Sequence, residues 1–152
     1  MNAENNKSFE KTIAVTLKGA SQERALDFAT FLKANGMEAG GENGAVNYKG
    51  NPVAYIHMDG MPEMPGPWTV WPEGDFSVVP DGFSFDEALK ETAWSNINKC
   101  GDCGSNCAPG SRKVIFGREF NNICNSVMAF NDPDDNALAC LKKLLEMKLC
   151  TL

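Results

Sequence analysis

The sequence has a single histidine, few basic residues and no long apolar run. That histidine is His57, so an ordinary catalytic zinc site, which relies on several imidazoles, is not available to this chain. The 14 lysines and arginines are outnumbered by 20 acidic residues, and the net charge is −6. Because nucleic acid and anionic membranes attract excess positive charge, we expect neither as a partner.

Signals for export and for common enzyme classes are missing as well. The opening residues, MNAENNKSFEKT, lack the basic and apolar segments of a secretion signal. No apolar run approaches the roughly 18 residues of a membrane-spanning helix. No Ser-His-Asp set, phosphate-binding glycine loop or pair of catalytic acids is present. We therefore expect a cytoplasmic protein with a binding function rather than an enzyme.

Length and composition indicate one globular domain covering residues 1–152. The chain is 43% hydrophobic and 22% charged, which is ordinary for a folded protein. No repeat, low-complexity tract or linker divides it.

The hydrophobic pattern predicts an α+β fold, with a mainly antiparallel sheet and three main helices. Helices are expected after Ser21, after a capping box of Ser84 and Glu87, and after Asp132-Pro133. The expected strands cover residues 12–18, 45–48, 53–58, 68–71, 76–79, 113–116 and 123–130. Two βαββ-like halves are one arrangement that this order allows. The last helix is expected to bury Leu138, Leu141, Leu144 and Leu145.

Four of the six cysteines lie in one segment, residues 99–124. Cys100, Cys103 and Cys107 have the spacing C-x2-C-x3-C, and Cys124 follows them. A C-x2-C pair can hold two thiolates on one turn, and a more distant cysteine can complete a tetrahedral shell around zinc. We therefore predict that Cys100, Cys103, Cys107 and Cys124 bind zinc. A shell of four sulfurs leaves no position for water, so the zinc would be structural.

Other roles for these cysteines remain open. An iron–sulfur cluster also uses four cysteines, although the usual ferredoxin spacing differs. Cys100 and Cys103 could instead form a thiol redox switch, a disulfide or the active site of an oxidoreductase. Cys100 follows the end of a predicted helix, however, where the helix dipole opposes a thiolate. The four cysteines could also be inert thiols, and Cys140 and Cys150 are expected to pack as small apolar residues.

Aromatic residues are concentrated before the cysteine segment. Tyr55, Trp68 and Trp71 could form the wall of a small-molecule pocket, or they could belong to the core. His57 shares the predicted face of Tyr55, and we interpret it as a structural histidine.

Basic residues surround the cysteine segment. Lys99, Arg112, Lys113 and Arg118 are opposed by Asp102 and Glu119. Such an excess of cations could contact a phosphate group, or it could be ordinary solvated surface charge.

Several motifs of the C-terminal part resemble a group of small bacterial proteins, many of them from anaerobes, to which no activity is assigned. The shared pattern is CxxCxxxCxPG followed by FGxEFxxxC, here Cys100 to Gly110 and then Phe116 to Cys124. Trp94, the Gly66–Trp71 segment and Asn131–Asp134 also match. The resemblance covers the last 60 or so residues well, and it implies that the four cysteines act as one unit.

Overall fold

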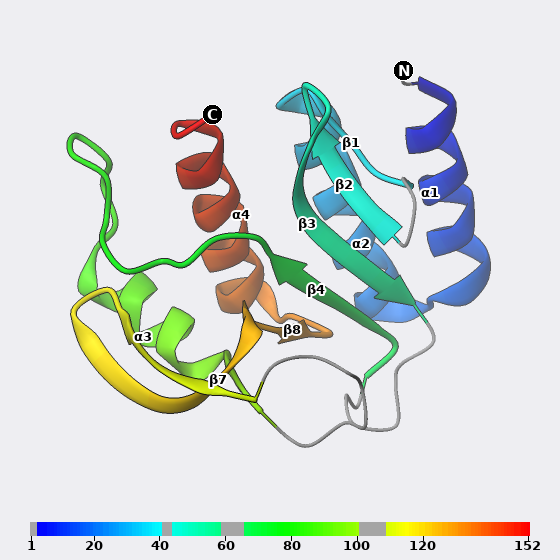
Figure 1. Cartoon of the computed structure of the whole chain (residues 1–152). Coiled ribbons are helices and arrows are strands. Elements are labelled where there is room, and N and C mark those ends of the chain that lie inside the picture. Colours follow the sequence, from blue (N-terminus) through cyan, green and yellow to red (C-terminus); the bar gives the residue numbers. More distant parts are fainter. Residues whose placement is uncertain (1–2, 41–43, 59–65, 101–108) are drawn as a thin grey trace.

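The structure is a computed structural model that describes residues 3–40, 44–58, 66–100 and 109–152 (Figure 1). Within these ranges the chain forms four helices and two antiparallel sheets, one of five strands and one of three. The predicted α+β class with a mainly antiparallel sheet is confirmed. None of the described helices combines the length and apolar character that crossing a membrane requires.

The elements follow one another in the order shown by the colours of Figure 1. They are α1 (Ala3–Thr16), α2 (Gly19–Ala34), β1 (Met37–Glu38), β2 (Ala45–Tyr48), β3 (Asn51–Met58), β4 (Trp68–Pro72), α3 (Glu87–Ser95), β5 (Ile97–Lys99), β6 (Ser111–Ile115), β7 (Arg118–Met128), β8 (Phe130–Asn131) and α4 (Asp135–Leu149). The larger sheet has the strand order β1-β2-β3-β4-β8, and the smaller sheet has the order β5-β7-β6.

The first helix replaces the strand predicted for residues 12–18, and that prediction is wrong. Phe9, Ile13 and Leu17 recur every four residues and are 7%, 0% and 1% exposed, as the buried face of a helix requires. Val15, which a strand would bury with Ile13 and Leu17, is 80% exposed. The N-terminal segment is therefore helical, and it packs against α2 and β1.

The strands predicted for residues 45–48 and 53–58 are observed, and they form a hairpin of β2 and β3. Tyr48 pairs with Asn51, so the turn consists of Lys49 and Gly50 alone. Their φ angles are +50° and +82°, a pair of left-handed conformations that matches the twist of two antiparallel strands. Glycine adopts such a φ without steric cost, which explains its place in this turn.

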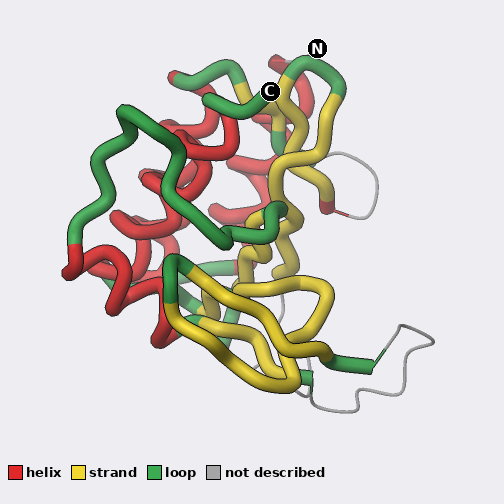
Figure 2. Tube along the Cα trace, turned by 60° about the vertical axis from the view of Figure 1, so that its left-hand side comes forward, coloured by secondary structure: helices red, strands yellow, loops and turns green. Residues whose placement is uncertain are grey.

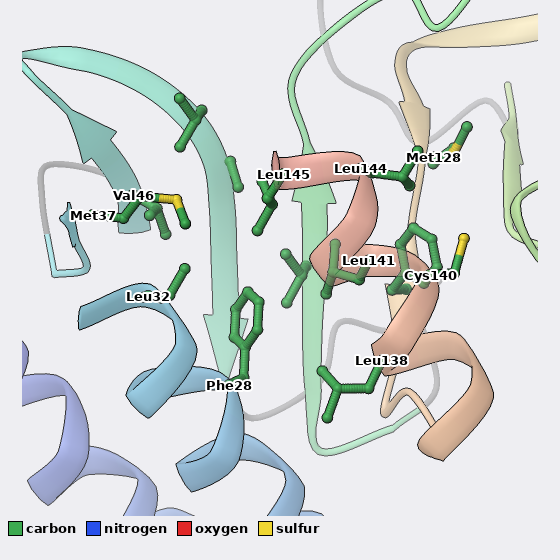
Figure 3. Packing of buried hydrophobic residues seen from close by; sticks show 14 of the residues in the cluster. Phe28, Leu32, Met37, Val46, Met128, Leu138, Cys140, Leu141, Leu144 and Leu145 are labelled. Atoms are coloured by element: carbon green, nitrogen blue, oxygen red, sulfur yellow. The ribbon is translucent and has the colours of Figure 1, made fainter. Parts of the chain in front are cut away.

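Helices α2 and α4 cover one face of the larger sheet, and the tube in Figure 2 shows the helices on one side and the strands on the other. The ring of Phe28, on α2, lies 5.9 Å from that of Trp68, on β4. Figure 3 shows the apolar side chains of α2 and α4 gathered beside the strands. The predicted stripe of α4 is buried: Leu138, Leu141, Leu144 and Leu145 are at most 4% exposed.

The chain passes directly from the smaller sheet into the larger one. Strand β7 ends at Met128, and β8, which belongs to the larger sheet, begins two residues later. The residue between them, Ala129, donates its backbone N–H to the carbonyl of Asn96 at 3.0 Å. Phe130 then pairs with Val70 of β4.

Two helix starts differ from the prediction. The side chain of Asp86, rather than Ser84, caps α3 by accepting a backbone N–H at 2.9 Å. Asp134, rather than Asp132, caps α4 in the same way, at 2.8 Å. Each acid lies directly before the first helical residue, where a side-chain oxygen can reach the unpaired N–H groups of the first turn.

Asp132 has a different role. Its Oδ1 accepts hydrogen bonds from the Ser21 hydroxyl at 2.7 Å and from Nε1 of Trp68 at 3.2 Å. Ser21, predicted to cap α2, is already inside that helix, whose N-cap is Lys18. Ser21 and Asp132, which were both predicted as helix caps, instead connect α2 to the segment before α4.

Residues 76–79, predicted as a strand, are irregular. Phe76 has a φ of +54°, and its carbonyl accepts the backbone N–H of Phe116 at 2.9 Å. Phe116 lies in the β6–β7 turn with a φ of +46° and is 6% exposed. Its ring centroid is 4.8 Å from that of Phe85 and 6.2 Å from that of Phe76. The long connection between β4 and α3 is thus attached to the smaller sheet by an aromatic cluster.

Candidate functional site

Cys100 and Cys124 lie close to each other in the smaller sheet. Cys100 directly follows β5, and Cys124 lies within β7. Lys99, which precedes Cys100, pairs with Ile123, which precedes Cys124. Since the strands are antiparallel, the two cysteines are diagonal neighbours across this pair, a relation that corresponds to about 7–8 Å between Cα atoms. Both are free thiols and half-buried.

Asn122 holds the backbone of Cys100 on both sides. The Cys100 N–H donates to the Asn122 carbonyl at 2.8 Å, and Nδ2 of Asn122 donates to the Cys100 carbonyl at 3.1 Å. Asn122 has a φ of +58°, and asparagine is among the few residues besides glycine that adopt this conformation readily. These two bonds fix the position from which the Cys100 side chain extends.

Gly110 packs directly against the same two residues. A Cβ atom at Gly110 would lie 2.7 Å from Cβ of Cys100 and 2.5 Å from Oδ1 of Asn122. Any other residue would therefore displace them. Cys100 and Gly110, which lie on either side of residues 101–108, are therefore close together in space. Cys124 follows two residues after Asn122 in the sequence.

Cys103 and Cys107 lie outside the described residues, so the complete tetracysteine set remains a prediction. Among the residues that the structure does describe, no three Cys, His, Asp or Glu side chains are grouped so that they could hold a metal ion. The predicted cysteine segment contains more regular structure than a loop, because β6 and most of β7 lie within it.

The two remaining cysteines differ from each other. Cys140 is fully buried on α4, as predicted, and its Sγ lies 3.5 Å from the carbonyl oxygen of Leu89. Burial raises the pKa of the Cys140 thiol from 9.0 to about 12, because a thiolate would be poorly solvated there. Cys150 is exposed just after α4, so the prediction that it packs in the interior is wrong.

The structure brings together two of the three predicted ligand-binding aromatics. Tyr55 on β3 pairs directly with Trp71 on β4, and both are half-buried. Trp68 is 0% exposed and packs toward α2. Residues 68 and 71 point to opposite faces of the sheet, since side chains alternate along a strand. Tyr55 and Trp71 therefore lie on the face away from α2, and Trp68 belongs to the core.

His57 lies on the same strand face as Tyr55, as predicted. It pairs with Thr69 of β4, whose hydroxyl donates to Oδ1 of Asn131 at 2.8 Å. This face thus combines two aromatic rings with an imidazole and a buried hydroxyl.

Sequence reasoning did not identify Asn122 as part of the cysteine site, and Gly110 entered only as the last residue of the shared motif. The adjacent asparagines at 121 and 122 were a weak signal for a left-handed residue. The approach of Gly110 to Cys100 could not be inferred, because it depends on how β6 and β7 close around the segment between them.

Comparison with protein-family models, with curated proteins and with solved structures finds no match for this chain.

Proposed function

We propose that this chain is a small, non-enzymatic protein of the cytosol, in which Cys100, Cys103, Cys107 and Cys124 bind one structural zinc ion. The observation that carries the proposal is that Cys100, Gly110 and Asn122 pack against one another. Asn122 is two residues before Cys124 in the sequence. Cysteines far apart in sequence thereby come to one end of the smaller sheet. A C-x2-C-x3-C segment attached at this place has the ligand types that zinc prefers.

Such a zinc ion would stabilise the segment rather than react. With four thiolates as ligands, no coordination position is open to water or substrate. Zinc binding to a site of this kind contributes on the order of 10 kcal/mol to folding. That contribution is comparable to the net stability of a whole domain.

The Tyr55–Trp71 pair supports a second role, the binding of a small molecule. Both rings are partly accessible on the sheet face opposite α2, and the half-buried His57 adds a polar group to the same face. Aromatic surface with a few polar groups is the usual composition of a ligand site. Trp68 does not contribute, because it is buried.

Elemental analysis of protein purified without oxygen tests the zinc proposal. We expect a colourless protein with one zinc ion per chain. Cys100→Ser and Cys124→Ser should each lose the metal, whereas Cys150→Ser, at an exposed position beyond α4, should retain it. Iron with visible absorption would indicate an iron–sulfur cluster instead, and a crosslink between cysteines without metal would indicate thiol redox chemistry. Either result would refute the zinc assignment.

Gly110→Ala tests the contribution of the surrounding backbone. The added methyl group would overlap Cys100 and Asn122, so it should displace the Cys100 thiolate while leaving all four cysteines in place. Changes beside metal ligands typically reduce affinity about 10–100-fold. Competition with a chromophoric chelator measures that affinity, and an affinity equal to that of the wild type would show that this contact does not position Cys100.

A further inference from the structure

Arg118 differs from the other two arginines of the chain. Arg24 pairs with Asp135 at 3.0 Å, and Arg112 pairs with Glu119 at 2.7 Å. Arg118 is exposed, and no described carboxylate forms an ion pair with it. In a chain with more acidic than basic residues, an exposed arginine that none of the described acids neutralises is a feature that needs an explanation.

Aromatic rings hold the Arg118 side chain in place. Its guanidinium carbon lies 5.2 Å from the ring centroid of Trp94 on α3, and 5.4 Å from that of Phe120 on β7. Trp94 is itself fixed, since its Nε1 donates to the carbonyl of Ile115 at 2.8 Å. Figure 1 shows α3 beside the hairpin that contains β7. A guanidinium that packs on aromatic rings keeps N–H groups that can still donate to an anion.

The sheet register places a second cation on the same face. Lys113 pairs with Phe120, and Ile115 pairs with Arg118, so these four side chains share one face. Lys113 and Arg118 are therefore diagonal neighbours, whose Cα atoms are about 7–8 Å apart in sheets of this kind. Arg112 and Glu119 lie on the opposite face, where each neutralises the other.

We propose that Arg118, with Lys113 beside it, binds the phosphate group of a small phosphate-bearing molecule. A guanidinium presents parallel N–H donors that match two oxygens of a phosphate. Two adjacent cations suit a dianion better than they suit a single carboxylate. Because the rings already restrict the Arg118 side chain, less conformational entropy is lost on binding. The net charge of −6 disfavours an extended polyanion, so the ligand is a small molecule rather than nucleic acid.

The three arginines make a direct test feasible. In nitrogen-15-labelled full-length protein, each arginine gives one Nε–H signal, which single substitutions assign. We expect phenyl phosphate, titrated at constant ionic strength, to shift the Arg118 signal to saturation while the Arg24 and Arg112 signals barely move. Arg118→Gln should weaken binding at least tenfold, as measured by the Trp fluorescence of the chain. Arg118→Lys should weaken binding several-fold, because lysine keeps the charge but lacks the parallel N–H donors of the guanidinium.

Arg112→Gln is the matched control, since it removes an exposed arginine of the same hairpin from the other face. It should leave the affinity unchanged. Benzoate, which carries one carboxylate on the same ring, should bind at least tenfold more weakly than phenyl phosphate. Equal affinities for the two compounds would overturn the assignment to phosphate. Unsaturable shifts of all three arginine signals, or wild-type affinity in Arg118→Gln, would overturn the site itself.

Discussion

Phe116 is a position at which glycine should be more stable than alanine, although both lose the same ring. Its φ of +46° is left-handed, a conformation that is uncommon for a bulky residue. The ring compensates for this, being 6% exposed and packed against Phe76 and Phe85. Replacing Phe116 by alanine removes the ring and keeps the left-handed Cβ, whereas glycine removes both.

The magnitudes follow from these two contributions. Loss of a buried phenylalanine ring costs about 3–5 kcal/mol. A Cβ atom in the left-handed region costs about 1–2 kcal/mol, and the greater freedom of glycine in the unfolded chain offsets about 0.5–1 kcal/mol of this gain. We therefore expect Phe116→Ala to destabilise the fold by about 3–5 kcal/mol. Phe116→Gly should be less damaging than Phe116→Ala by roughly 0.5–1 kcal/mol.

Urea unfolding followed by circular dichroism measures both free energies. Phe28 is the matched control, because it is a fully buried phenylalanine within α2. There, glycine should be less stable than alanine by about 1 kcal/mol, since helices disfavour glycine. The reasoning fails if Phe116→Gly is the less stable of the two variants at position 116, as it should be at position 28.

Four further predictions concern other parts of the fold. Asp134→Ala, which removes the cap of α4, should lower the free energy of unfolding by about 1 kcal/mol in urea titrations, and no measurable loss would contradict the assigned cap. Cys140 should resist iodoacetamide at pH 8 while exposed Cys150 reacts, and rapid labelling of native Cys140 in peptide mass spectra would contradict its burial. Because the folded pKa of Cys140 is above its unfolded value of 9.0, its contribution to stability is complete below pH 9 and should decline between about pH 9 and 12, a decline that should be absent in Cys140→Ala. Asp132→Ala leaves the buried Nε1 of Trp68 without its acceptor and should cost about 1–3 kcal/mol, whereas Asp132→Asn, which keeps an oxygen, should be milder in the same urea assay.

The sequence was most informative where a local pattern matched the final packing. The leucines of α4 at helical spacing are buried, and the Lys49-Gly50 turn joins two strands. The N-terminus was misread because Ile13 and Leu17 fit a period of two as well as a period of four. Only the burial of Phe9 and the exposure of Val15 separate the alternatives.

The backbone contacts around the candidate site could not be predicted from the sequence. The spacing of the cysteines predicted a set of four thiols, of which the structure describes two: Cys100 directly after β5, and Cys124 within the neighbouring strand β7. The hydrogen bonds between Cys100 and Asn122 join residues 22 positions apart in the sequence. Hydrophobic periodicity reports local structure and does not show which distant residues pair. Trp68 was grouped with Tyr55 by composition alone, and the alternation of β4 places it on the other face of the sheet.

The single residue between β7 and β8 has a consequence for how the molecule melts. Ala129 is 7% exposed, and its backbone is bonded to Asn96, so no flexible spacer separates the two sheets. The smaller sheet cannot detach while β8 stays paired with β4, because a hinge there would need free backbone rotation. Amide protons of β4 and β7 should consequently exchange with solvent in one shared opening event, as in a single cooperative unit.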